Sequence, residues 1–278
     1  MYIEIENYNV LLEDFNDILI DYDIACEGVS STASSILKQA ISMVKRLLTQ
    51  FYSFIINKLK NVKKSNKNKS DEKEEKEEKE EVIKINITNW NIGNFANIIS
   101  NYMGVLKGNL NLIPMTDFSK GIETDNERDL DQVIYSLNFK MDGILSSEVM
   151  EKRTKELKSQ LYEGGTPKKI TLDNSTEYGK TKIKEYKDNK NIIDHILNGV
   201  YKNQSEINRE VQIMQNTVDS IGKNIDTEDK LLKKRNELLA TMRAYVKVIT
   251  ELINGYIKDF NKIITEFVKD YKQINKLV

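Results

Sequence analysis

Residues 193–225 read IDHILNGVYKNQSEINREVQIMQNTVDSIGKNI, and this stretch decides the fold. Its apolar side chains recur at alternating spacings of four and three residues from Ile193 to Ile225, and Gln204 is the only polar member of the series. A seven-residue repeat with two apolar positions is typical of a coiled-coil seam. The sequence therefore predicts a long helix that packs along one side against another helix.

A second long helix is expected to follow the first. Residues 222–226 interrupt the seam, Thr227 and the acids after it suit the first turn of a helix, and apolar positions continue from Leu238 to Ile274. Two long helices joined by a short turn fold back antiparallel. We expect residues 182–278 to form such a hairpin, which either closes on itself or exchanges between subunits of a homo-oligomer.

Residues 82–181 are expected to form a helical subdomain with one pair of short strands. Ile83, Ile85 and Ile87 alternate with polar residues, and a second alternation, at residues 168–172, follows a Gly-Gly-Thr-Pro breaker. Between them we expect helices at residues 92–107, 125–139 and 146–162, a loop at residues 109–121 and a break at Gly143. The predicted fold is mainly α: a helical bundle with a long C-terminal antiparallel hairpin and at most a small two-stranded β element.

The composition offers little for catalysis or metal binding. The chain has 278 residues, 39% apolar and 31% charged, which suits a soluble helical protein of one large domain or two small ones. The only cysteine, Cys26, and the only histidine, His195, lie in different expected elements. Gly179-Lys180-Thr181 ends like a phosphate-binding loop, but Asn174 stands where the first glycine is required. We therefore predict no catalytic, cofactor or metal site, and no enzyme.

The charge of the chain reverses sharply near Gly28. Residues 1–28 carry eight acids and no base, and their apolar residues follow the three-four spacing of an amphipathic helix. Residues 29–70 contain no acid. Removing residues 1–27 would change the formal net charge from −1 to +7. The intact and trimmed chains would therefore meet polyanions differently.

Residues 29–62 are expected to form a basic amphipathic helix, and residues 63–81, which lack apolar side chains, a charged disordered linker. The helix can pack in the bundle, lie on an anionic membrane or bind nucleic acid without sequence specificity. The candidate contacts with DNA or another anionic surface are its basic side chains and those just after it: Lys38, Lys45, Arg46, Lys58, Lys60, Lys63 and Lys64.

The junction Ile24-Ala25-Cys26-Glu27-Gly28, between an acidic and a basic amphipathic segment, resembles that of the internal capsid proteins of large tailed bacteriophages. In that family the leading segment targets the protein into the immature head, and a prohead protease cuts after the glutamate. The resemblance implies cleavage between Glu27 and Gly28. Leu161-Tyr162-Glu163-Gly164 fits the Leu-x-Glu form of such sites and makes Glu163 and Gly164 a second candidate pair, or else a helix stop at glycine.

The resemblance implies a noncatalytic virion structural protein, made in the bacterial cytoplasm and packaged inside the capsid without a cofactor. Its partners would be capsid or scaffold proteins and, nonspecifically, packaged DNA. Two alternatives stay open: a membrane-active protein that uses residues 34–62 at a membrane surface, and a coiled-coil scaffold that relies on the C-terminal hairpin.

Overall fold

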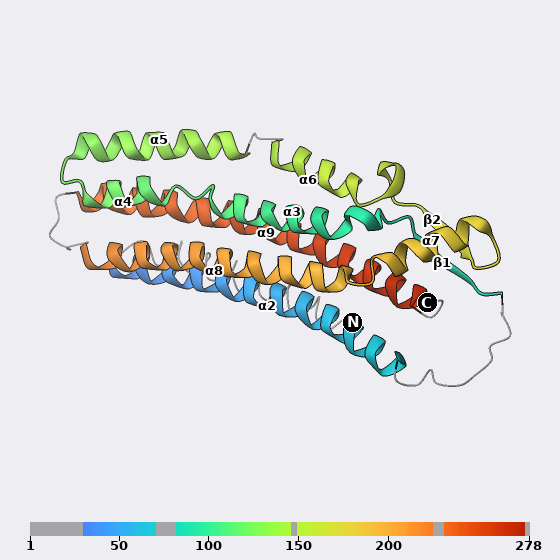
Figure 1. Ribbon diagram of the computed structural model, residues 1–278. Coiled ribbons are helices and arrows are strands. Elements are labelled where there is room, and N and C mark those ends of the chain that lie inside the picture. The colour runs from blue at the N-terminus through green and yellow to red at the C-terminus, as the bar shows by residue number, and fades with distance from the viewer. Residues whose placement is uncertain (1–29, 71–81, 146–148, 225–230, 276–278) are drawn as a thin grey trace. The chain divides into compact units, whose positions relative to one another are not determined.

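The computed structural model describes residues 30–70, 82–145, 149–224 and 231–275 (Figure 1). The chain forms two compact units, the first from residues 1–50, 107–147 and 205–254 and the second from residues 51–106, 148–204 and 255–278. Four helices contribute residues to both units, namely α2 (Ser30–Ser70), α3 (Ile92–Leu110), α8 (Ile192–Asn224) and α9 (Leu232–Ile274). The fold is mainly α with one two-stranded sheet, as predicted.

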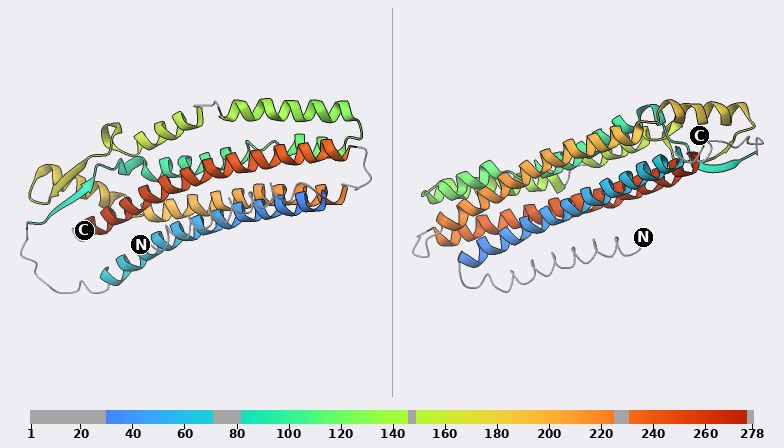
Figure 2. Two further views of the ribbon diagram at one scale, coloured as in Figure 1. Left: turned by 180° about the vertical axis from the view of Figure 1, so that it is seen from behind. Right: turned by 60° about the horizontal axis from the view of Figure 1, so that its bottom comes forward.

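The two predicted C-terminal helices are α8 and α9, and they run antiparallel within each unit (Figures 1 and 2). The described seam positions of α8 are buried, whereas Gln204 is partly exposed. The helix α9 begins at Leu232, and Thr227 lies outside the described residues. Its apolar face is buried from Leu238 to Ile274, so both helices present a continuous stripe to the core.

The first unit packs the N-terminal part of α2 and the helices α4 (Met115–Glu123) and α5 (Glu127–Leu145) with parts of α8 and α9. Tyr245 of α9 donates a 2.5 Å hydrogen bond to the carbonyl oxygen of Leu137 in α5, and its ring meets Phe118 of α4 edge-on at 5.7 Å. Two sequence expectations were wrong here. The expected loop at residues 109–121 contains most of α4, which starts after Pro114, and Gly143 lies inside α5.

The second unit contains the sheet, in which β1 (Lys84–Thr88) pairs antiparallel with β2 (Lys169–Asp173). Ile85 lies opposite Leu172 and Ile87 opposite Ile170, which confirms the predicted pairing. Ile87 and Leu172 are fully covered, so one face of the sheet belongs to the core. After β2, helix α7 (Glu177–Asp188) is capped by the Thr176 hydroxyl, which accepts a hydrogen bond from the N–H of Gly179.

A buried carboxylate joins β1 to α9 in the second unit. The Oδ2 atom of Asp270 accepts hydrogen bonds from the Thr88 N–H at 2.8 Å and from the Trp90 indole at 3.0 Å. Trp90 also stacks on Tyr162 and meets Phe267 edge-on. The segment between β1 and α3 is thereby fixed to α9 by both polar and aromatic contacts.

The helix α2 extends beyond its expected C-terminal end. It runs from Ser30 to Ser70, so residues 63–70 are helical instead of belonging to the disordered linker, and residues 71–81 lie outside the described part of the chain. The Lys and Asn residues at its end extend a helix that the preceding turns have already nucleated. The remaining expected helices match α3, α5 and α6 (Val149–Gln160) with ends shifted by a few residues.

Candidate functional site

The apolar face of α2 is buried within the chain itself. In the first unit Ile41 and Leu48 are at most 3% exposed, and in the second Phe51, Ile55 and Leu59 are fully covered. The Phe51 ring meets Phe260 of α9 edge-on at 5.4 Å. The interpretation that this helix packs in a bundle is therefore confirmed, and its aromatic residues Phe51 and Tyr52 belong to the core. Among the described residues, no helix is long and apolar enough to cross a membrane.

Several of the candidate basic side chains already have partners in the chain. Lys38 forms a 2.9 Å ion pair with Asp219, and Lys63 forms one of 2.6 Å with Asp194. Lys45 donates a 3.5 Å hydrogen bond to the Gln215 side chain. These partners belong to α8, so part of the basic character of α2 is used to hold these two helices together. Because the pairs are about half exposed, each contributes at most about 1 kcal/mol.

The remaining candidates differ in how available they are. Lys58 donates to the Thr265 hydroxyl at 2.9 Å and lies over the Phe54 ring, so it belongs to the α2–α9 contact. Lys60 lies over the ring of Tyr201. Arg46, Lys60 and Lys64 are exposed, and none of them forms an ion pair with a described acid. These three are the candidate residues best able to meet an external anion.

The second candidate cleavage site lies in a constrained turn. Glu163 and Gly164 belong to a 3₁₀ turn, η1 (Glu163–Gly165), where Gly164 has φ = 74°. Asn89 clamps this turn, since its carbonyl oxygen accepts from the Glu163 N–H at 2.8 Å and its side-chain amide donates to the Glu163 carbonyl at 2.6 Å. The Glu163 carboxylate pairs with Lys182. The two glycines Gly164 and Gly165 are exposed, but Leu161 is fully buried.

This geometry argues against cleavage at Glu163, and the glycines do not end the preceding helix, because α6 already stops at Gln160. A protease needs a stretch of extended backbone, and here that would require breaking the Asn89 hydrogen bonds and withdrawing Leu161 from the core. The first candidate pair, Glu27 and Gly28, lies outside the described residues together with the rest of the leader and Cys26.

Two further sequence features have structural explanations. His195 is exposed on the surface of α8. Gly179, in the string that ends like a phosphate-binding loop, packs directly on β2, because a Cβ atom there would lie 1.9 Å from the Asp173 carbonyl oxygen. The requirement for glycine is therefore steric. No group of three or more metal-ligating side chains occurs among the residues that the structure describes.

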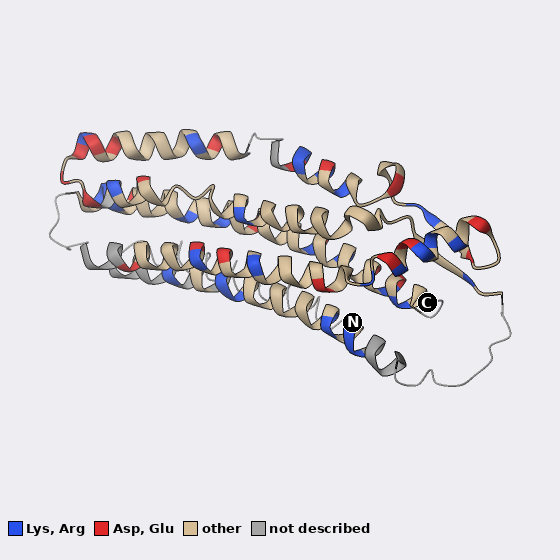
Figure 3. Cartoon of the chain, in the orientation of Figure 1, with Lys and Arg blue, Asp and Glu red and all other residues tan. Residues whose placement is uncertain are grey.

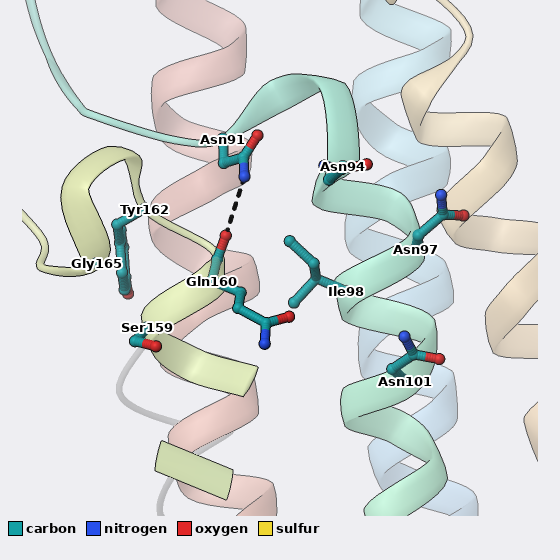
Figure 4. A pocket seen from close by; sticks show the side chains of 9 residues that line it. All are labelled: Asn91, Asn94, Asn97, Ile98, Asn101, Ser159, Gln160, Tyr162 and Gly165. Carbon is teal, nitrogen blue, oxygen red and sulfur yellow. Dashed lines mark hydrogen bonds between the residues drawn. The ribbon is translucent and has the colours of Figure 1, made fainter. Parts of the chain in front are cut away.

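The sequence reading overlooked a polar groove in the second unit. It lies between α3 and the end of α6, has a volume of about 570 Å³, and Figure 4 shows the side chains that line it. The lining residues are Asn91, Asn94, Asn97, Ile98, Asn101, Ser159, Gln160, Tyr162 and Gly165. Burial, followed by the charges of Glu266 and Asp259, raises the pKa of the Tyr162 hydroxyl to about 12, so this group stays neutral near pH 7. The groove lining therefore carries no charge.

A signal for this groove was present in the sequence. Residues 89–106 contain no charged residue, although 31% of the chain is charged, and asparagine recurs there every two to four residues. Figure 3 shows the same gap in charge along α3. An uncharged but polar helix face is unusual in this chain and distinguishes this segment from the rest of the sequence.

Comparison with models of protein families, with curated proteins and with solved structures finds no match for this chain.

Proposed function

We propose that this chain is a noncatalytic structural protein of the interior of a tailed-phage head, in which α2 presents basic side chains to packaged DNA or another polyanionic surface. The acidic leader, residues 1–27, is proposed to direct the chain into the immature head and to be removed after Glu27. The long helices α8 and α9 would then serve as the supporting scaffold, with capsid or scaffold proteins as partners.

One observation favours this proposal over the membrane-active alternative. Most of the described apolar side chains of α2 are buried in the core of each unit, while Arg46, Lys60 and Lys64 remain exposed. A membrane-active helix would need its apolar face for the lipid, and exposing Phe51 would require opening the second unit. An exposed basic side can instead meet an anion without any change in the fold.

The polyanion contact is tested by the salt dependence of DNA binding. Each lost phosphate contact reduces the magnitude of the slope of log K against log salt concentration by about 0.9. We therefore expect the triple variant Arg46→Gln, Lys60→Gln, Lys64→Gln to have a slope smaller by about 2.7 than the unmodified protein. Both are measured in the fragment that begins at Gly28. A matched control removes the same charge from the exposed residues Lys152, Arg153 and Lys168. Equal slopes for both triple variants would remove the role proposed for α2.

Processing is tested by the intact mass of the protein from mature particles. A chain that begins at Gly28 supports the proposal, whereas a full-length chain in mature heads contradicts removal of the leader.

Flotation with anionic liposomes distinguishes the proposed function from the membrane-active alternative. We expect that the folded protein does not float with the liposomes. Efficient flotation would favour membrane binding instead, provided that it disappears in the double variant Phe51→Asp, Phe54→Asp and that this variant keeps its helicity.

A further inference from the structure

We propose that the groove between α3 and the end of α6 binds an uncharged, polyhydroxylated ligand, a short neutral oligosaccharide. The proposal is independent of the phage-head function, because it concerns the second unit alone and none of the basic residues of α2. The volume of about 570 Å³ lies within the range of about 300–1,000 Å³ that is usual for small-molecule sites.

The wall on α3 is built from regularly spaced asparagines. At about 100° per residue, Asn91, Asn94, Asn97 and Asn101 cover roughly one third of the helix circumference, together with Ile98. At about 1.5 Å per residue this row is roughly 15 Å long. In Figure 4, Ile98 and the Gln160 side chain extend into the space between the two elements, and Asn97 and Asn101 stand along α3. A ligand can therefore contact successive amides along the row.

The amides of this wall are available for a ligand. Asn94, Asn97, Asn101 and Gln160 are exposed, and their side chains make no hydrogen bonds to other described residues. Asn91 is the exception, since its amide donates to the Gln160 carbonyl oxygen at 3.3 Å. Each free amide can donate two hydrogen bonds and accept two. Asparagine is also a poor residue for a helix interior, so a purely solvated face would be better served by Ala, Lys or Glu.

The chemistry of the lining selects a neutral ligand. There is no charged side chain in the groove to attract a phosphate, carboxylate or ammonium group, and Tyr162 stays protonated near pH 7. An amide that donates to one hydroxyl and accepts from its neighbour matches the adjacent hydroxyls of a sugar ring. An extended peptide could also pair with amides, but it gains specificity from apolar side-chain pockets. Here Ile98 and Tyr162 are 5% and 6% exposed, which leaves little apolar surface.

The experiment uses the full chain and a panel of neutral trisaccharides: maltotriose, cellotriose and N,N′,N″-triacetylchitotriose. Saturation-transfer NMR detects binding, and the side-chain amide signals of the protein locate it. We expect at least one trisaccharide to bind and to shift the amides of Asn94, Asn97 and Asn101. Two hydrogen-bonding amides are removed in Asn94→Ala, Asn97→Ala, which should weaken binding by roughly tenfold or more.

The control is the double variant Asn57→Ala, Asn198→Ala, which removes two exposed side-chain amides from helices outside the groove. Both double variants should fold, because these side chains make no hydrogen bonds to described residues and alanine favours the helix. Binding that survives the groove variant, or that is lost equally in the control, would overturn the site. No saturation transfer to any trisaccharide overturns the ligand class, as does binding of a neutral peptide such as tetraalanine in place of the sugars.

Discussion

The buried carboxylate of Asp270 provides the sharpest test of how the second unit is held together. Its side chain is 2% exposed, and a single oxygen, Oδ2, accepts from both the Thr88 N–H and the Trp90 indole. Replacing Asp270 with Ala leaves two buried donors without a partner. Each unsatisfied donor costs about 1–3 kcal/mol, so the variant should lose about 2–6 kcal/mol of unfolding free energy.

The Asp270→Asn variant should behave very differently. One amide oxygen can occupy the position of Oδ2 and accept both hydrogen bonds, so the two donors stay satisfied. What is lost is the 3.7 Å contact with Lys169, whose side chain is 57% exposed, and such a contact contributes at most about 1 kcal/mol. Comparing the unfolding free energy lost in Asp270→Ala with that lost in Asp270→Asn therefore shows whether Asp270 stabilises the unit by accepting hydrogen bonds or by its charge.

Equilibrium unfolding in urea measures both losses. Trp90 is the only tryptophan and is 2% exposed, so its fluorescence reports on this site. At a slope of about 3 kcal/mol per M, a loss of about 3 kcal/mol lowers the midpoint by about 1 M. The control is Asp259→Ala on the same helix, where the ion pair with Lys158 is about half exposed. If Asp270→Ala costs no more than this control, or no more than Asp270→Asn, the reasoning is refuted.

Three further outcomes are expected. Gly179→Ala should destabilise the chain by about 3 kcal/mol or more because its Cβ would meet the Asp173 carbonyl, whereas Gly255→Ala, with open space around it, should stabilise α9 by about 0.5–1 kcal/mol in the same urea assay. Burial alone would raise the pKa of Glu266, but hydrogen bonds from Lys169 and Thr88 lower it overall. Its contribution to stability is therefore present above its ordinary pKa of 4.5 and is lost as the pH falls through the lower folded value, and Glu266→Gln should flatten this acid limb of the stability profile. Burial raises the pKa of six tyrosines, so their contribution to stability is fully present below their ordinary pKa of about 10 and is lost as the pH rises from there toward the higher folded values. If they ionise only on unfolding, phenolate absorbance should rise together with the loss of helical circular dichroism. The six are Tyr102, Tyr162, Tyr186, Tyr245, Tyr256 and Tyr271.

The parts of the fold that the sequence predicted are those with a strong period. The seam of α8 and the stripe of α9 repeat over many turns, and the alternation around Ile85 and Leu172 was sufficient to pair two distant strands. The nine-residue helix α4 was missed because it is short and contains polar residues such as Asp117, and because Pro114 and the residues before it resemble a loop. Gly143 was misread as a break, although a glycine in open space inside a helix costs only about 1 kcal/mol.

The candidate site was only partly predictable. The basic residues of α2 could be read directly, but their partners on α8, such as Asp194, are far away in sequence and no local pattern announces them. The role of Asp270 was hidden for the same reason, since its hydrogen-bond donors precede it by about 180 residues. The groove has only a weak signal in the sequence, because asparagine is common throughout this chain and only the absence of charge in residues 89–106 sets the segment apart.

The pairing of β1 with β2 also bears on how the chain reaches this structure. Lys84 lies opposite Asp173, so forming the sheet closes a loop of about 90 residues, with an entropic cost of about 4 kcal/mol for a flexible chain. Helices α3 to α6 lie inside that loop and make it shorter and stiffer once they have formed. We therefore expect the two strands to meet after the helices, late on the folding pathway. Substitutions at Ile87 or Leu172 would then accelerate unfolding far more than they slow folding.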